Sequence, residues 1–258
     1  MRTIGRSCFA ESGLEEIALP RGTECVNENA FFGCHSLRRA DITNCALKTI
    51  KESAFEGSEV EEFVAPPSLR RVCRRAFAAC RSLKLVDLSE CTHSGDVDGA
   101  ELYLAPFAFE DCGVESALLP DTMTMIPDHL FVSCGRLKTV RLPARLELIC
   151  QESFRDCGLR RLEVPRGVRR IEERAFCGCG DLWSVSFEAG SCLEEVGFEA
   201  FYGAGLGSFA APPSLRKVGD LAFGGCAALK DLRLHEGVRE LGWLCLWVTA
   251  VCEVRLPP

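Results

Sequence analysis

Apolar residues recur along this chain in one frame that is used many times. The segment LEEIALPRGTECVNENAFFGCHSL near the beginning and the segment LRRLEVPRGVRRIEERAFCGCGDL much later share this frame, although the charges between its positions differ. Both segments begin with apolar residues at their first, fourth and sixth positions, and this spacing ends in the alternation typical of a short β-strand. The pattern therefore predicts a short strand in every copy of the frame.

An aromatic residue marks the same position in almost every unit. These anchors are Phe9, Phe31, Phe55, Phe77, Phe109, Phe131, Phe154, Phe176, Phe201 and Phe223, and Leu246 takes the eleventh place. Successive anchors are 22 to 25 residues apart, except for one step of 32 residues. Self-similarity at such a period is typical of solenoid proteins. We therefore expect a single solenoid domain over residues 1–258, built from about eleven units.

The units alternate between two forms. In the shorter form the next apolar frame residue lies five residues after the anchor, and in the longer form it lies six residues after it. Every shorter unit has a proline eleven residues after its anchor, namely Pro20, Pro66, Pro120, Pro165, Pro212 and Pro257. Because proline favours tight turns, we expect a fixed turn in this form. The longer form contains the insertion at residues 89–101 and therefore tolerates loops.

No single unit can bury its own apolar face, so each must pack against its neighbours. Stacked units would align their strands in a parallel sheet with about 4.8 Å between strands. The anchors would then form a ladder of phenylalanine rings in the core. Alanine precedes the anchor in seven units, which fits a tightly packed turn where a larger side chain would clash.

At this point the sequence resembles the BspA-like class of leucine-rich repeats, whose unit has the form LxxIxLPxxVxxIGxxAFxxC. LEEIALPRGTECVNENAFFGC and LRRLEVPRGVRRIEERAFCGC are similar to that unit, and the similarity extends over the whole chain. The resemblance implies an α/β-type repeat solenoid, a right-handed leucine-rich repeat with a parallel β-sheet face and little regular helix. It also implies protein recognition, often at cell surfaces, and it carries over no catalytic residues.

The charge and hydropathy of the chain argue against two classes of partner. The formal net charge is -7 and the pI is near 5.3, whereas a nucleic-acid-binding surface needs a basic face, so we expect no nucleic-acid partner. The first residues contain no apolar signal segment, and LGWLCLWVTAVC is too short to span a bilayer as a helix. We therefore expect no membrane insertion and favour an intracellular location, with the cell surface as the alternative.

Cysteine recurs three residues after the anchor in seven units. These residues, which we call the thiol ladder, are Cys34, Cys80, Cys112, Cys134, Cys157, Cys179 and Cys226. They could form disulfides, bind a metal as thiolates, or remain buried thiols. Side chains in register on stacked strands point the same way, which leaves their Cβ atoms farther apart than a disulfide prefers. Ser58, Ala204 and Thr249 take the same place in other units, which favours buried thiols.

Recognisable catalytic and metal-binding motifs are missing from the sequence. No GxSxG, Walker, HExxH or CxxC motif occurs, and the four histidines lie in different units. The insertion contains Cys91, His93, Asp96 and Asp98 as candidate metal ligands, but their spacing does not match an EF-hand loop. We therefore favour a solvated loop there and predict no enzyme activity, no cofactor and no metal.

Residues between the apolar frame positions would point outward from the sheet, three per unit. The first outward column alternates in charge from Glu15 to Lys138, which favours neighbouring strands in register. The alternation stops at a group that we call the basic–aromatic patch, which consists of Lys138, Arg141, Arg160, Arg161 and Trp183. Small residues surround Trp183, so it is an interaction hot spot, an aromatic side chain lying flat on the sheet, or a side chain that a neighbouring chain segment covers. In the first case the expected ligand is an acidic peptide or loop with an apolar anchor.

Trp243 and Trp247 make the last unit unusually apolar, and neither end of the chain has a polar capping unit. The domain could be cut from a longer protein, its ends could pair in end-to-end self-association, or the two tryptophans could act as a cap. Taken together, these features predict a non-catalytic scaffold that binds a protein or peptide on its exposed strand face. The alternative is a structural or adhesive module within a longer cell-surface protein.

Overall fold

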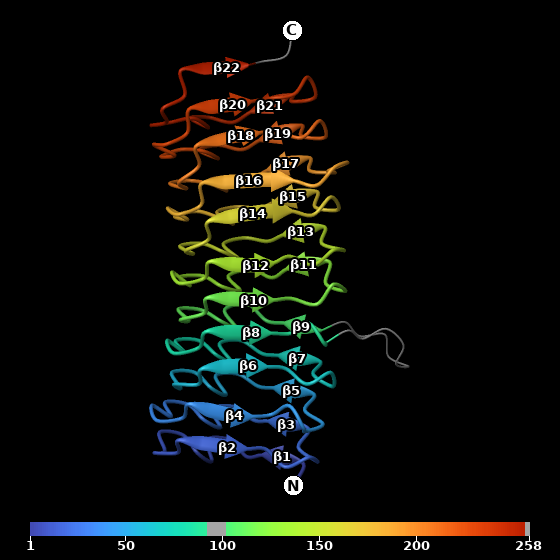
Figure 1. Ribbon diagram of the computed structural model, residues 1–258, viewed down its shortest axis with the longest axis vertical. Helices are drawn as coiled ribbons and strands as arrows, with labels where there is room; N and C mark the ends of the chain where they lie inside the picture. Colours follow the sequence, from blue (N-terminus) through green and yellow to red (C-terminus); the bar gives the residue numbers. More distant parts are fainter. Residues whose placement is uncertain (92–101, 256–258) are drawn as a thin grey trace.

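A computed structural model of the protein describes residues 1–91 and 102–255, and every regular element in these ranges is a β-strand (Figure 1). The strands stack one above another along the long axis as a parallel solenoid of the leucine-rich-repeat type with about ten turns. The expected α/β label is not confirmed, because the described residues contain no helix. Eleven complete repeats are not confirmed either, since eleven anchors delimit only ten intervals.

Each turn contributes one strand to each of two faces, shown on the left and right of Figure 1. The even-strand face contains β2 (Glu16–Ala18), β4 (Arg39–Asp41), β6 (Glu62–Val64), β8 (Leu85–Asp87), β10 (Ser116–Leu118), β12 (Thr139–Arg141), β14 (Arg161–Val164), β16 (Ser184–Phe187), β18 (Ser208–Ala210), β20 (Asp231–Arg233) and β22 (Glu253–Arg255). The odd-strand face contains β1 (Thr3–Ile4), β3 (Cys25–Val26), β5 (Thr49–Ile50), β7 (Arg71–Val72), β9 (Tyr103–Leu104), β11 (Met125–Ile126), β13 (Leu148–Ile149), β15 (Arg170–Ile171), β17 (Glu195–Val196), β19 (Lys217–Val218) and β21 (Glu240–Leu241).

All pairs of neighbouring strands that are hydrogen-bonded are parallel and in register, for example Ile126 opposite Ile149 and Ile149 opposite Ile171. The strands of the even-strand face, which the sequence predicted, form a series with three interruptions, between β4 and β6, between β12 and β14, and between β16 and β18. The odd-strand face, which the sequence did not predict, is interrupted between β9 and β11. Its strands are only two residues long, too short for an alternating pattern to be recognised.

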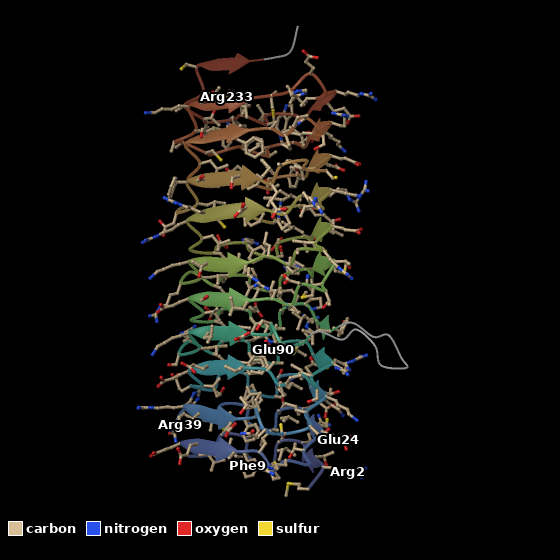
Figure 2. All side chains as sticks on the ribbon, turned by 45° about the vertical axis from the view of Figure 1, so that its right-hand side comes forward. Arg2, Phe9, Glu24, Arg39, Glu90 and Arg233 are labelled. Carbon is tan, nitrogen blue, oxygen red and sulfur yellow. The ribbon has the colours of Figure 1, made fainter. Side chains whose placement is uncertain are left out.

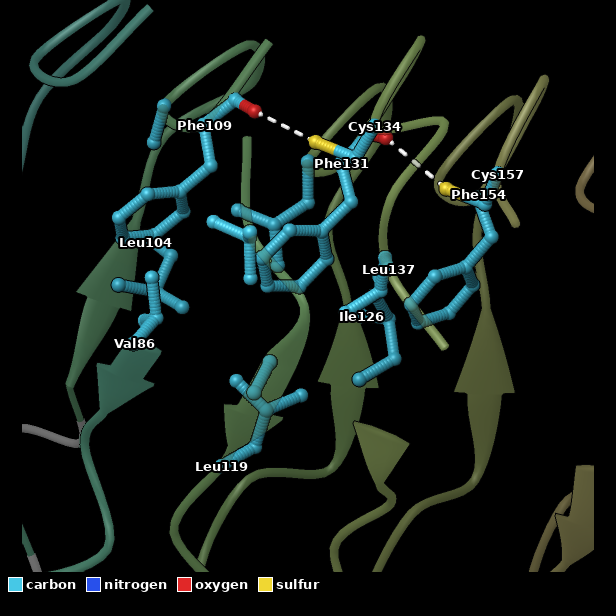
Figure 3. Packing of buried hydrophobic residues seen from close by; sticks show 14 of the residues in the cluster. Val86, Leu104, Phe109, Leu119, Ile126, Phe131, Cys134, Leu137, Phe154 and Cys157 are labelled. Atoms are coloured by element: carbon cyan, nitrogen blue, oxygen red, sulfur yellow. Dashed lines mark hydrogen bonds between the residues drawn. The ribbon is translucent and has the colours of Figure 1, made fainter. Parts of the chain in front are cut away.

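The predicted aromatic ladder forms the core. Nine consecutive ring pairs from Phe9 to Phe223 stack with centroids 4.9–5.7 Å apart and interplanar angles of 1–15°. Figure 3 shows three of these rings, Phe109, Phe131 and Phe154, in line. All three are fully buried, so each ring contacts the rings of the turns on both sides. The core is therefore one continuous column rather than a set of separate clusters.

Left-handed residues, rather than a helix, shape the turn around each anchor. The residues two before and two after the anchor have positive φ in every unit, as at Asn29 (φ 54) and Gly33 (φ 65) around Phe31. Between them, backbone N–H groups donate to carbonyls of the next turn, for example from Phe31 to the oxygen of Ala54 at 2.7 Å. An α-helix would need these N–H groups for bonds to carbonyls four residues earlier in the same segment. Because they are bonded to the next turn instead, no helix forms here.

The thiol ladder is buried, and each of its thiols has the same partner. Every Sγ donates to the carbonyl oxygen of the anchor one turn earlier, as from Cys134 to Phe109 at 3.0 Å and from Cys157 to Phe131 at 3.1 Å (Figure 3). This geometry agrees with the buried-thiol interpretation, because each thiol makes its own hydrogen bond in a space that fits only a small side chain. Cys91 is likewise buried, while the other candidate ligands of the insertion, His93, Asp96 and Asp98, lie outside the described residues.

The buried thiols should make the folded protein less stable at alkaline pH. Burial raises the pKa of the Cys179 and Cys226 thiols from about 9 to about 12. Below pH 9 both thiols are protonated in the folded and in the unfolded protein, so their full contribution to stability is present. As the pH rises from 9 towards 12, the thiols ionise more readily in the unfolded protein, and this contribution is lost. The free energy of unfolding should therefore fall above pH 9, as urea denaturation of the reduced protein at pH 8 and pH 10 would show. A Cys179→Ser, Cys226→Ser variant should lose less stability over that interval, and an equal loss would contradict this explanation.

Candidate functional site

The outward residues of the even-strand face are exposed or half-buried, as the alternation in the sequence predicted. In β14, for example, Arg161 and Glu163 are exposed while Leu162 and Val164 are buried. Charged side chains project from this surface, among them Arg39 (Figure 2). Arg39 pairs with Glu16, and Lys84 lies 3.6 Å from Glu61 on neighbouring turns. Because these pairs are largely exposed, each contributes little to stability.

Trp183 and Arg161, which lie on adjacent turns, are in direct contact. The Arg161 guanidinium lies 4.3 Å from the centre of the Trp183 ring, which is a cation–π arrangement. Trp183 remains 47% exposed, and a Cβ at the neighbouring Gly207 would meet no atom within 4 Å. The indole therefore contacts Arg161 and keeps about half of its surface available for other contacts.

The basic residues of the predicted patch do not form one continuous cluster. The interruption between β12 and β14 separates Lys138 and Arg141 from Arg160 and Arg161. Arg141 is neutralised by Asp121, whose Oδ2 lies 3.0 Å from its Nη2. Across residues 1–91 and 102–255, neither Lys138 nor Arg160 has an ion pair, so both charges remain available.

A groove that the sequence did not predict lies towards the carboxyl end of β16, the strand that follows Trp183, and Trp183 itself is not one of its lining residues. It occupies about 770 Å³ where β16 and β18 separate, and its lining includes Ser186, Phe187, Ala210 and Pro213. Ser186, which lines the groove, is three residues beyond Trp183 in the sequence, and Glu188 and Arg216 add one charge of each sign to the lining. The available sequence signal was the step of 25 residues between Phe176 and Phe201, which is the longest step apart from the insertion.

A second depression, of about 700 Å³, lies at the interruption between β4 and β6. Its lining includes Arg38, Arg39, Asp41, Glu61 and Glu62, so charges of both signs are mixed there. The Glu16–Arg39 pair satisfies one of these charges internally. The groove at β16 and β18 also has one charge of each sign in its lining, Glu188 and Arg216, but most of its other lining residues are small or apolar.

Trp243 and Trp247 belong to a different surface, on the last turns of the solenoid. Trp243 is 69% exposed, and Trp247 stacks on Tyr202 at 6.5 Å. Their exposed apolar neighbours are Leu241, Leu244 and Val248. The structure therefore does not join them to the basic–aromatic patch.

Among the described residues, a histidine next to a carboxylate is the group that most resembles a catalytic site, but its side chains form a structural network. His129 stacks on Phe107 at 4.3 Å and lies 3.4 Å from the Glu152 carboxylate. Glu152 also pairs with Arg155 at 3.0 Å. These groups are engaged with one another across successive turns, and the network contains no activated nucleophile.

Comparison with known proteins places the repeat in a family. A family model described as BspA type leucine rich repeat region matches in six copies at residues 2–96, 103–230 and 194–258. No curated protein sequence matches significantly. Among the described residues, no helix has the length and apolar character needed to cross a bilayer.

Several solved structures resemble this chain. The pneumococcal vaccine antigen PcpA is 17% identical with a TM-score of 0.54, over 98% of this chain and 73% of that one. A leucine-rich repeat protein from Bacteroides ovatus is 19% identical with a TM-score of 0.48, over 93% and 78% of the two chains. A leucine rich cell surface protein from Faecalibacterium prausnitzii is 20% identical with a TM-score of 0.47, over 98% and 82%. With its repeat matched along nearly its whole length, the chain belongs to the BspA-type leucine-rich repeat family.

Proposed function

We propose that this protein is a non-catalytic scaffold that binds a protein or peptide on its even-strand face. The observation that carries the proposal is the Trp183–Arg161 pair, which is exposed among small residues, and a groove of about 770 Å³ lies farther along β16. Aromatic and arginine side chains are the residues most enriched in interaction hot spots. The stacked core holds both at fixed positions, so a ligand meets an ordered surface.

The chemistry of this surface favours an acidic ligand with an apolar anchor. Arg161 and Arg160 provide positive charge, while Trp183 and Phe187 provide apolar contact area. An acidic segment would be attracted to the cations, and its apolar side chain could occupy the groove between β16 and β18. The groove lies where the strands separate, which suits a loop or extended peptide better than a flat protein surface.

Replacing Trp183 by alanine should separate binding from stability. Because the indole is about half exposed and is not a core residue, the free energy of unfolding should change by no more than about 1 kcal/mol. Binding of the partner should weaken by at least about tenfold, because truncation of a hot-spot residue typically costs about 2 kcal/mol or more. Thermal denaturation checks the first expectation, and a large drop in melting temperature would instead identify Trp183 as core.

Affinity capture from the native lysate, followed by mass spectrometry, tests the proposal. The test variant is Trp183→Ala, Arg161→Glu. The odd-strand face offers a matched control, since Arg71 lies 5.1 Å from the ring centre of Tyr103, which is 49% exposed. A protein that is captured by the wild type and the Arg71→Glu, Tyr103→Ala control, but not by the test variant, would support the proposal. The same proteins captured by all three would contradict it.

A second candidate is a structural or adhesive module that associates end to end, as in a longer cell-surface protein. The observation that favours it is the exposed apolar group Leu241, Trp243, Leu244, Trp247 and Val248, which a second copy would bury. Sedimentation of the wild type should then show association that increases with concentration. A Trp243→Glu, Trp247→Glu variant should remain monomeric. A wild type that is monomeric at every concentration would exclude self-association through this surface.

A further inference from the structure

Three side chains that can ligate a metal lie together beside the odd-strand face, away from the surface of the proposed function. They are Asp128, Cys150 and Glu172, from three successive turns, and one ligand atom from each lies within 4.8 Å of the other two. The residues are 22 positions apart in the sequence, which is the commonest step of the repeat. The register of Ile126, Ile149 and Ile171 in β11, β13 and β15 brings them into proximity.

Cys150 differs from the members of the thiol ladder. It is only 5% exposed, and its Sγ has no hydrogen-bond partner within the described ranges. Every ladder thiol, by contrast, donates to an anchor carbonyl. Among the described residues, Cys150 is the one buried cysteine whose Sγ makes no hydrogen bond, since Cys45 and Cys91 also donate to backbone carbonyls. Here the unpartnered sulfur lies against two carboxylates, which together are the donor set of a cation site.

The surroundings leave room for an ion. One Asp128 oxygen, Oδ1, accepts a hydrogen bond from the Gln151 backbone N–H at 3.2 Å, which helps to hold the carboxylate in place. Glu172 is contacted by Arg170, whose Nη2 lies 3.7 Å from Oε1. Arg170 is 53% exposed and can turn away into solvent. Asp128 and Cys150 also line an open depression of about 300 Å³, which exposes this pair of ligands to solvent.

We propose that Asp128, Cys150 and Glu172 form a binding site for a divalent transition-metal ion of the Zn²⁺ class. A thiolate favours zinc over the hard ions Mg²⁺ and Ca²⁺, which prefer all-oxygen sites. Three protein ligands leave the fourth tetrahedral position to water. On binding, the Cys150 thiol releases its proton to solvent and the sulfur becomes the ligand.

The geometry requires only a modest contraction. Zinc–ligand distances of roughly 2.0–2.3 Å place tetrahedral ligand atoms about 3.3–3.8 Å apart. The ligand atoms here lie within 4.8 Å of one another, and the carboxylates of Asp128 and Glu172 are not buried, so side-chain rotation suffices. Because the bound ion would tie three turns together, zinc should raise the melting temperature of the protein.

The test is titration of reduced, metal-free protein with Co²⁺, a spectroscopic substitute for zinc, followed by competition with Zn²⁺. We expect one equivalent to bind with sulfur-to-cobalt charge-transfer absorption in the near ultraviolet, and zinc to displace it. Cys150→Ser should lose this band, and Glu172→Gln should bind at least about tenfold more weakly. A Cys8→Ser, Cys192→Ser, Cys252→Ser control removes the exposed thiols and should retain the bound equivalent.

Every result of this titration either supports or overturns the proposed metal site. The absence of a stoichiometric band in the wild type would overturn the proposal, as would a band that persists unchanged in Cys150→Ser or disappears with the control. If Cys150→Ser does not fold by circular dichroism, Asp128→Asn and Glu172→Gln decide in its place. These two affect side chains that are not buried, and unchanged cobalt affinity in both would exclude the site.

Discussion

Replacement of Phe131 by alanine is expected to lower the free energy of unfolding by about 3–5 kcal/mol, the usual cost of removing a large ring from a core. Phe131 is fully buried and stacks on Phe109 at 5.4 Å and on Phe154 at 5.7 Å. The cavity would lie in the middle of the aromatic column, where the hydrogen-bonded turns on both sides limit collapse. Chemical denaturation followed by circular dichroism would measure the loss.

Phe32 provides the control for this prediction. It belongs to the same kind of turn, but 37% of its surface is exposed and it is not a member of the ladder. Phe32→Ala should change the free energy of unfolding by less than about 1 kcal/mol. A similar small effect for Phe131→Ala would mean that the stacked rings are not the principal core of the protein.

Replacement of Gly158 by alanine is expected to cost about 2 kcal/mol, because overpacking against backbone usually costs 1–3 kcal/mol. A Cβ at this position would lie 2.3 Å from the carbonyl oxygen of Gly135, one turn earlier. Gly158 belongs to a unit of the shorter form, in which the chain reaches its next frame position one residue sooner than in the longer form. The close approach of backbone to backbone is a consequence of that shortening.

The matched control is Gly135, whose carbonyl oxygen the added Cβ at position 158 would meet. A Cβ at Gly135 would meet no atom within 4 Å, and Gly135 does not have a positive φ. Gly135→Ala should therefore be neutral or stabilise by up to about 1 kcal/mol through the unfolded state. Equal melting temperatures for the two variants would contradict the proposed packing of short and long units.

Several features could be predicted because they repeat in register. The anchors identify the aromatic column, and the cysteines three residues later identify the thiol ladder, since a stacked repeat places equivalent residues above one another. The outward positions of the even-strand face followed from the alternation of apolar and variable residues. Each of these predictions used many copies of one pattern.

Other features could not be predicted because they depend on local geometry. The left-handed positions are taken by residues as different as Arg75, Phe107 and Leu221, so composition does not indicate them. The odd-strand face has only two residues per strand, and the groove along β16 and β18 arises where these neighbouring strands separate. Asp128 lies two residues after Ile126, whereas Cys150 lies one residue after Ile149, the partner of Ile126 in the sheet. The two residues therefore do not occupy equivalent positions when the repeat units are aligned.

The most direct test of the even-strand face as the recognition surface is photocrosslinking in the native lysate. A photoreactive phenylalanine at Ser208, which is exposed on β18 beside Trp183, is compared with the same residue at Tyr103, exposed on β9 of the odd-strand face. We expect a discrete crosslinked protein from position 208 that is absent from position 103 and is lost with Arg161→Glu. A crosslink from position 103 alone, or the same protein from both positions, would contradict binding at the even-strand face.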